Sequence, residues 1–393
     1  MKKASKLLAI ALSAVMALGF AGCGGNTTTS SNASKTDGSS SGTTSEVKAM
    51  PAVAKDKIKI GVIHIGDPAD GAGYSFAHDQ GIQAMKETLG LRDDQIINKI
   101  NIPDEDVAAT RTAIEECIEE GCHIIFGTSF NYMNTMEELA NEHKDVIFSH
   151  ATGYKNNGVN MNNYFGRIYQ ARYLAGIAAG MRTESNQIGY VAAMDIQNSE
   201  VTGGINAFAM GVKSVNPDAK VYVKVTNTWF DVTKEKQAAE ALLDLGCDVI
   251  AQHCDTTAPQ LAAEERGKWG CGYNSDMTPA APKAHLTAPI WNWGVYYTTA
   301  VQEVIDGKWK PVNYFGGMAE GFVGVSPLSE NCVEGTQAKI DEVSAKIKDG
   351  SFKVFEGELK DNQGNVVCKE GEVISDADIT GHMNWYFENV EVK

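Results

Sequence analysis

The feature that most constrains the fold of this chain is a regular alternation of short apolar runs with segments of helical periodicity. The first series begins at Lys57, where KIKIGVIHI (57–65) predicts a buried parallel strand. Its other members predict strands at 97–102, 123–128 and 146–151, and helices at 76–89, 105–120 and 133–143. Repeated strand–helix units form parallel sheets that are covered by helices on both faces.

A second series follows a loop and repeats this pattern. It predicts helices at 168–182, 199–213, 232–245 and 257–266, and strands at 188–193, 220–225 and 249–254. About 340 residues follow the N-terminal region, which is more than one hydrophobic core usually holds. The sequence therefore predicts two doubly wound α/β lobes, in which ligands bind beyond the carboxyl ends of the strands.

The N-terminus predicts export and a lipid anchor. Three lysines precede an apolar run from Leu7 to Phe20, which is too short to span a bilayer and predicts a signal peptide at 1–22. The next residues, FAGC, resemble a bacterial lipobox apart from Phe in place of the usual leucine. They imply lipid attachment at Cys23, with plain secretion as the alternative. Residues 23–56 are rich in Ser, Thr and Gly and predict a flexible, lipid-anchored linker.

Charge and cysteine content narrow the possible functions. A formal net charge of −16 argues against nucleic-acid binding, because an acidic surface does not neutralise phosphates. The cysteines after Cys23 have no CxxC spacing, so neither a disulfide framework nor a zinc site is indicated. We therefore expect no metal and no cofactor.

Aromatic and polar residues gather after the predicted strands. They lie in the stretches 66-GDPADGAGYSFAHD-79, 128-TSFNYM-133, 226-TNTWFD-231 and 272-GYNSDM-277. The first stretch is rich in glycine but lacks the Lys-Ser/Thr of a phosphate-binding loop. These residues predict a cleft between the lobes, because the carboxyl ends of parallel strands meet at one edge of a sheet. A catalytic pair at His253 and Cys254 is disfavoured, because adjacent residues of a strand point to opposite faces.

Six stretches resemble the basic membrane protein (BMP) family, the solute-binding lipoproteins of ABC importers that include purine nucleoside receptors. They are 73-GYSFAHDQG-81, 127-GTSFNYM-133, 164-YFGRIYQARYLAGIAAG-180, 205-INAFAMGVKSVNP-217, 233-TKEKQAAEALLDLGCDVIAQHCD-255 and 273-YNSDMTPAAPKAHLTA-288. The resemblance implies a type I periplasmic-binding-protein fold, with lobe 1 at 57–164 plus 286–320 and lobe 2 at 165–285 plus 321–393. It also implies ABC permease partners, a monomer and no enzymatic activity.

The resemblance suggests which aromatic rings contact the ligand. The family's Ser-Phe position lines the pocket, so Tyr74 or Phe76 is expected there; strand alternation, with one core ring and one exposed ring, is the alternative. Trp229 stands where the family places a ring that stacks on a base, with a cap on the core of the lobe as the alternative. Stacking of this kind contributes roughly 1–3 kcal/mol per base.

Polar candidates complete the expected site. Asn274 can donate and accept hydrogen bonds, and the carboxylates of Asp276 and Asp255 can accept from purine N–H groups. A helix cap is the structural alternative for Asp276. Ser129 either bonds the ligand or caps the helix that follows it.

The stretch 288-APIWNWGVYY-297 bears on the choice of ligand. Nucleoside-binding relatives carry a lysine near the position of Trp291 that reaches the ribose, whereas residues 286–297 contain none. Asn274 also replaces the first acidic residue of a paired-aspartate motif. We therefore expect Trp291 to close the pocket on a free purine base such as adenine. The alternative is that Trp291 and Trp293 only pack between the lobes.

Other functions remain open at this stage. A purine nucleoside or riboflavin could occupy the same aromatic cleft. A secreted nucleoside hydrolase would need an acid/base or metal cluster at the strand ends, and the sequence indicates none. A sensor or adhesin that feeds no transporter is a further alternative.

Overall fold

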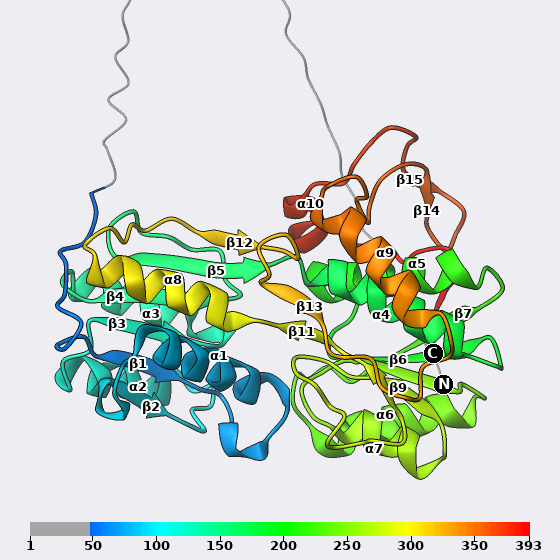
Figure 1. The fold of residues 1–393 in the computed structure, drawn as a ribbon, viewed down its shortest axis with the longest axis horizontal. Coiled ribbons are helices and arrows are strands. Elements are labelled where there is room, and N and C mark those ends of the chain that lie inside the picture. Colours follow the sequence, from blue (N-terminus) through cyan, green and yellow to red (C-terminus); the bar gives the residue numbers. More distant parts are fainter. Residues whose placement is uncertain (1–47) are drawn as a thin grey trace, which may run out of the picture. The chain divides into compact units, whose positions relative to one another are not determined.

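Two six-stranded parallel sheets organise residues 48–393, which are the residues that this computed structural model describes (Figure 1). The predicted signal peptide, the lipidation site Cys23 and the linker as far as residue 47 lie outside the described residues. Within the described part, no helix is long and apolar enough to cross a membrane.

The first sheet has the strand order β12-β5-β4-β3-β1-β2. Its strands are β1 (Ile60–Ile63), β2 (Ile96–Lys99), β3 (Ile124–Gly127), β4 (Ile147–Ala151), β5 (Met161–Gly166) and β12 (Tyr314–Gly316). Four helices accompany it: α1 (Gly73–Leu89), α2 (Val107–Glu119), α3 (Met133–Glu142) and α8 (Trp293–Ile305). The side chains of α1 and α8 join one hydrophobic cluster and those of α2 and α3 another. Both faces of the sheet are therefore covered, which is why β1 and β3 in its interior are apolar and buried throughout.

The second sheet repeats this plan in the order β10-β9-β8-β6-β7-β16. Its strands are β6 (Gln187–Ala192), β7 (Lys220–Val225), β8 (Val249–His253), β9 (Trp269–Cys271), β10 (His285–Thr287) and β16 (Val390–Val392). Helices α4 (Ile168–Arg182) and α5 (Ser199–Val215) belong to one cluster, and α6 (Val232–Asp244) and α7 (Ala258–Glu265) to another. A Cβ on Gly176 would lie 2.1 Å from the carbonyl oxygen of Phe208, so α4 and α5 approach each other closely only because glycine stands there.

The chain passes between the sheets at three places. It leaves β5 for α4 through Arg167, and two further crossings contain β11 (Pro289–Trp291) and β13 (Val323–Val325). These two strands pair with each other in antiparallel orientation (Figure 1). Helix α8, drawn in yellow, thereby returns to lie beside α1 of the first sheet.

The C-terminal segment packs against the second lobe. It contains α9 (Thr336–Lys348), the hairpin strands β14 (Leu359–Lys360) and β15 (Val366–Cys368), and α10 (Asp376–Gly381). It ends with β16, which adds to the edge of the second sheet beside β7. Short 3-10 helices occur at η1 (Pro68–Asp70), η2 (Asp93–Gln95) and η3 (Phe130–Tyr132).

The predicted doubly wound architecture is confirmed, and the differences are local. Helix α1 begins at Gly73, earlier than predicted, so Tyr74 and Phe76 lie on a helix and the strand-alternation alternative for their rings is wrong. The sequence also treats 161–166 as loop, whereas MNNYFG forms β5. Its asparagines hide the strand pattern, and pairing with β4 and β12 on either side holds it in place. The proposed lobe boundaries stay a prediction.

Candidate ligand-binding site

The carboxyl ends of the two sheets meet at a contact between α1 and the second lobe. The backbone N–H of Gly73 donates to the hydroxyl of Ser275 at 3.2 Å. Gly73 has a φ of +85°, and a Cβ there would lie 2.4 Å from the carbonyl oxygen of Asp255. Only glycine permits this approach, which brings the start of α1 beside the segments that follow β8 and β9.

Tyr74 is the ring of α1 that lies at this contact. It makes edge-to-face contacts with His78, at 4.5 Å between ring centroids, and with Trp293, at 6.4 Å. Burial, then the nearby Tyr164 and the Asp255 carboxyl, raise the pKa of the Tyr74 hydroxyl well above its usual range, so the hydroxyl stays neutral. Phe76 is half-buried two residues further on and therefore lies on a different face of α1.

Asp255 and Asn274 form a buried pair in the second lobe. The side-chain amide of Asn274 donates to Oδ1 of Asp255 at 2.8 Å. Burial raises the pKa of Asp255 to about 8, so this carboxyl is largely protonated at neutral pH and can itself donate a hydrogen bond. Oδ1 of Asn274 is buried and has no hydrogen-bond partner among the described residues.

Trp229 follows β7 and is tied to this pair. Its carbonyl oxygen accepts from the backbone N–H of Asp255 at 2.9 Å. The half-buried indole contacts His253 edge to face, at 5.9 Å between centroids, and packs partly against the core. Trp229, Asp255 and Asn274, each predicted from its place after a strand, are thus neighbours in the second lobe.

The expected role of Trp291 fits the structure less well. Its ring stacks on Phe165 at 5.1 Å on one side and on Trp293 at 4.5 Å on the other, and Trp293 stacks in turn on His78 at 4.2 Å. We call Phe165, Trp291, Trp293 and His78 the crossover ladder. Both ring faces of Trp291 are covered and the residue is buried, which favours the alternative that it packs between the lobes. Its indole N–H donates to the hydroxyl of Tyr273 at 3.3 Å.

Ser129 and Asp276 are engaged elsewhere. The hydroxyl of Ser129 donates to Asp104 at 2.5 Å and makes no cap on the following 3-10 helix, so the helix-cap alternative is wrong. Asp276 is exposed and accepts from the backbone N–H and the hydroxyl of Thr278, at 2.9 and 2.6 Å. It therefore stabilises a turn rather than the helix that was the expected structural alternative.

The sequence missed several residues beside Asp255. The guanidinium of Arg172 on α4 lies 4.0 Å above the ring of Tyr273 and donates to the carbonyl oxygen of Gln252 at 2.8 Å. Its Nε and second terminal nitrogen are buried without a partner among the described residues. Glu200, at the start of α5, lies 3.0 Å from Nε2 of His253. We call Arg172, Glu200, His253, Asp255 and Asn274 the polar cluster.

Burial keeps two members of the polar cluster, Asp255 and His253, largely uncharged at neutral pH. Burial, with Arg172 nearby, lowers the pKa of His253 to about 4, so the ring is neutral at pH 7. A neutral ring beside a carboxylate donates through Nε2–H, and Nδ1 then accepts from the hydroxyl of Tyr190 at 3.3 Å. Glu200 lies just inside the helix that follows β6, and its place after a strand end is the signal that could have identified it.

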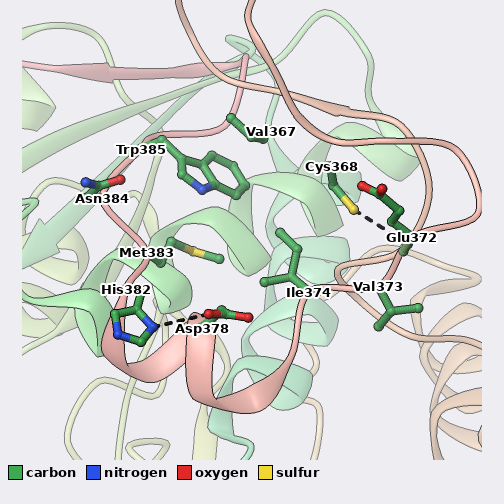
Figure 2. A pocket seen from close by; sticks show the side chains of 10 residues that line it. All are labelled: Val367, Cys368, Glu372, Val373, Ile374, Asp378, His382, Met383, Asn384 and Trp385. Atoms are coloured by element: carbon green, nitrogen blue, oxygen red, sulfur yellow. Dashed lines mark hydrogen bonds and ion pairs between the residues drawn. The ribbon is translucent and has the colours of Figure 1, made fainter. Parts of the chain in front are cut away.

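A surface pocket of about 530 Å³ lies apart from these residues, between β15 and α10 (Figure 2). Figure 2 shows Trp385 and Met383 on one side and the pair His382–Asp378, 3.1 Å apart, below them. None of the predicted site residues lines this pocket. The facing strand ends, which carry the polar cluster and two aromatic rings, are therefore the candidate site.

Two lobes with aromatic and polar groups at facing strand ends define a solute-binding protein with the type I periplasmic-binding-protein fold. Residues 57–356 match the family described as Bmp, ABC transporter substrate-binding protein PnrA-like. The chain belongs to this family of ABC transporter substrate-binding proteins.

Individual relatives agree with this assignment. A purine-binding protein of Brucella abortus is 39% identical over 73% of this chain and 82% of its own length. A Haloferax volcanii protein, provisionally named an ABC transporter glucose-binding protein, is 40% identical over 66% of this chain and 64% of its own length. A solved solute-binding protein of an ABC transporter from Aeropyrum pernix has the same fold, with a TM-score of 0.64, 18% identity and coverage of 75% of this chain and 92% of that chain.

Proposed function

We propose that this protein binds a free purine base, adenine in the first instance, between its lobes and delivers it to the permease of an ABC importer. The observation that carries the proposal is the contact of Gly73, next to Tyr74 on the first lobe, with Asp255 and Ser275 on the second. Asp255 in turn is hydrogen-bonded to Trp229 and Asn274. Two rings from opposite lobes suit a flat heterocycle, and stacking contributes roughly 1–3 kcal/mol per base. The 39% identical relative from Brucella abortus, named a purine-binding protein, supports this ligand class.

The polar groups favour a neutral base over a nucleoside. A protonated Asp255 and the Asn274 amide offer donors and acceptors for the edge of a base. Residues 286–297 contain no lysine for ribose hydroxyls, and the bulky, buried Trp291 stands near the position expected for that lysine. A ribose there would lose water from its hydroxyls without gaining equivalent hydrogen bonds. Ser129 and Asp276 contribute less to the proposed site, because their hydrogen bonds are made to Asp104 and Thr278.

Calorimetry tests this proposal with adenine, guanine, their nucleosides, riboflavin and glucose. Adenine should bind at about micromolar Kd or tighter, near −8 kcal/mol. The nucleosides should bind at least about tenfold more weakly. A nucleoside that binds as tightly as its base would refute the preference for a free base. Binding of glucose without binding of adenine would refute the purine class in favour of the ligand named for the Haloferax volcanii relative.

We also propose an extracytoplasmic location with a lipid anchor at Cys23, and a monomer that contacts permease subunits but no nucleic acid. The support is the FAGC sequence and membership in a family of ABC substrate-binding proteins. Cys23→Ala should release the protein into the medium or leave its precursor unprocessed, as fractionation and immunoblotting would detect. A variant that stays in the membrane with the mobility of the mature protein would contradict the anchor.

A further inference from the structure

Glu200 is the ionised member of the polar cluster that is best placed to contact a ligand. It is the second residue of α5, whose N-terminus follows the carboxyl end of β6. Burial opposes its ionisation, but the hydrogen bond with Nε2 of His253 and the charge of the Arg172 guanidinium keep the pKa of Glu200 below its ordinary value. The partial positive charge of the helix N-terminus acts in the same direction.

The carboxylate of Glu200 is fixed on one side and available on the other. Oε1 lies 3.0 Å from Nε2 of His253, which is itself held by Tyr190. Oε2 makes no hydrogen bond to any described residue, and 17% of the side-chain surface is exposed. A carboxylate oriented by a buried ring, with one oxygen free, can accept a hydrogen bond at low entropic cost.

Independent observations indicate that this region is incomplete without a ligand. Asn274 is fully buried, yet its Oδ1 has no partner among the described residues. Arg172 is 1% exposed and has two nitrogens without a partner there. The charge of Glu200 also helps to raise the pKa of both Asp255 and Tyr273, which means that these groups lie close together.

The hydrogen-bonding pattern of these groups is specific. Glu200 and Oδ1 of Asn274 accept hydrogen bonds, whereas the neutral Asp255 can donate one. An aminopurine offers the complementary set: N–H donors on its amino group and ring, and ring nitrogens that accept. A carbonyl oxygen in place of the amino group would face the Glu200 carboxylate with lone pairs and leave it unpaired.

We propose that Glu200 is a ligand-contacting residue that accepts a hydrogen bond from the exocyclic amino group of adenine and thereby selects amino over oxo purines. This inference rests on the proposed function. Hydrogen bonds to a charged group contribute enough for a preference of about tenfold to a hundredfold. Glu200→Gln removes the charge, and its amide can donate to an oxo group.

Titration calorimetry with adenine and hypoxanthine, which differ by this amino-to-oxo exchange, tests the proposal. The wild-type protein should prefer adenine by at least about tenfold, and Glu200→Gln should reduce that preference at least about tenfold. Glu265→Gln, an exposed change on α7, should keep the wild-type preference. Wild-type protein should also bind unsubstituted purine, which lacks the amino group, at least about tenfold more weakly than adenine; this measurement does not depend on how the variant folds.

The outcomes separate the two proposals. Equal wild-type affinity for adenine and hypoxanthine, or an unchanged preference in Glu200→Gln, would overturn the role of Glu200 and leave purine binding intact. Wild-type protein that binds neither base would overturn the proposed function together with this inference.

Discussion

The crossover ladder and the polar cluster both lie beside the contact between the lobes, but they are built in opposite ways. In the ladder, Trp291 and Trp293 are covered on both ring faces, and their neighbours are other aromatic rings. In the polar cluster, the guanidinium of Arg172 and the amide of Asn274 keep buried polar atoms without partners among the described residues, whereas in the ladder only the ring nitrogens Nε2 of His78 and Nε1 of Trp293 do so. Stacked rings gain stability from the burial of their apolar faces even where a ring nitrogen has no partner, whereas an unpartnered guanidinium or amide costs free energy until something binds it. The ladder is therefore suited to joining the lobes and the cluster to recognising a ligand.

The largest expected effect is on the ladder side. Trp293→Ala removes a fully buried ring stacked between Trp291 and His78, and should reduce the free energy of unfolding by about 3–5 kcal/mol. Denaturant unfolding of the ligand-free variant and wild type measures this difference in the free energy of unfolding. A loss of adenine binding without a loss of stability would contradict this comparison, because it would show that the ladder binds the ligand rather than joins the lobes.

Asp255→Asn tests whether the polar cluster stores unfavourable free energy. The pKa of Asp255 is raised to about 8, so its protonated form stabilises the folded state below its ordinary pKa, and this contribution is lost as pH rises toward 8. The amide of the variant cannot ionise, so the variant escapes this loss. As pH rises from 5 to 8, its free energy of unfolding should increase relative to that of the wild type by an amount on the order of 2–4 kcal/mol. Melting curves of the two ligand-free proteins across this range measure the difference. A difference that does not change with pH would mean that Asp255 is already ionised at pH 5.

Trp229→Ala should affect binding more than stability. Loss of a stacking ring should weaken adenine binding at least about tenfold, or about 1.4 kcal/mol, within the roughly 1–3 kcal/mol that such stacking contributes. The melting temperature of the ligand-free protein should change little, because this ring is only half-buried. Calorimetry and thermal melting are measured on the same preparation. A large loss of stability with intact affinity would show that Trp229 belongs with the ladder as a core residue.

The smallest effect is expected at the ion pair that links the C-terminal segment to the crossing between β5 and α4. Arg167, between β5 and α4, pairs with Asp376 of α10 at 2.9 Å and donates to the carbonyl oxygen of Phe315 in the first lobe at 3.0 Å. Both partners are partly exposed, so Asp376→Asn should cost at most about 1 kcal/mol. Small-angle scattering of the ligand-free variant should show more open molecules than wild type. An unchanged profile would mean that this ion pair does not influence the angle between the lobes.

Local patterns in the sequence determined the architecture. Apolar runs that alternate with segments of helical periodicity specify strands covered on both faces. This pattern can be read from each segment by itself, without knowledge of its tertiary contacts. The position after a strand also predicted that Trp229, Asp255 and Asn274 lie close together, because the topology of parallel sheets places the carboxyl ends of all strands at one edge. Tyr74 and Phe76 were predicted together, and the start of α1 at Gly73 places the two rings on different faces of one helix.

Tertiary structure decided what these residues contact and how they are charged. Strand β5 depends on β4 and β12 at its two sides, and the covered faces of Trp291 depend on rings distant in the chain. Arg172 and Glu200 resemble ordinary helix residues in the sequence, and they join Asp255 only when α4 and α5 pack behind β8. The raised pKa of Asp255 arises from burial and neighbouring charges contributed by separate segments, so no local pattern could encode it.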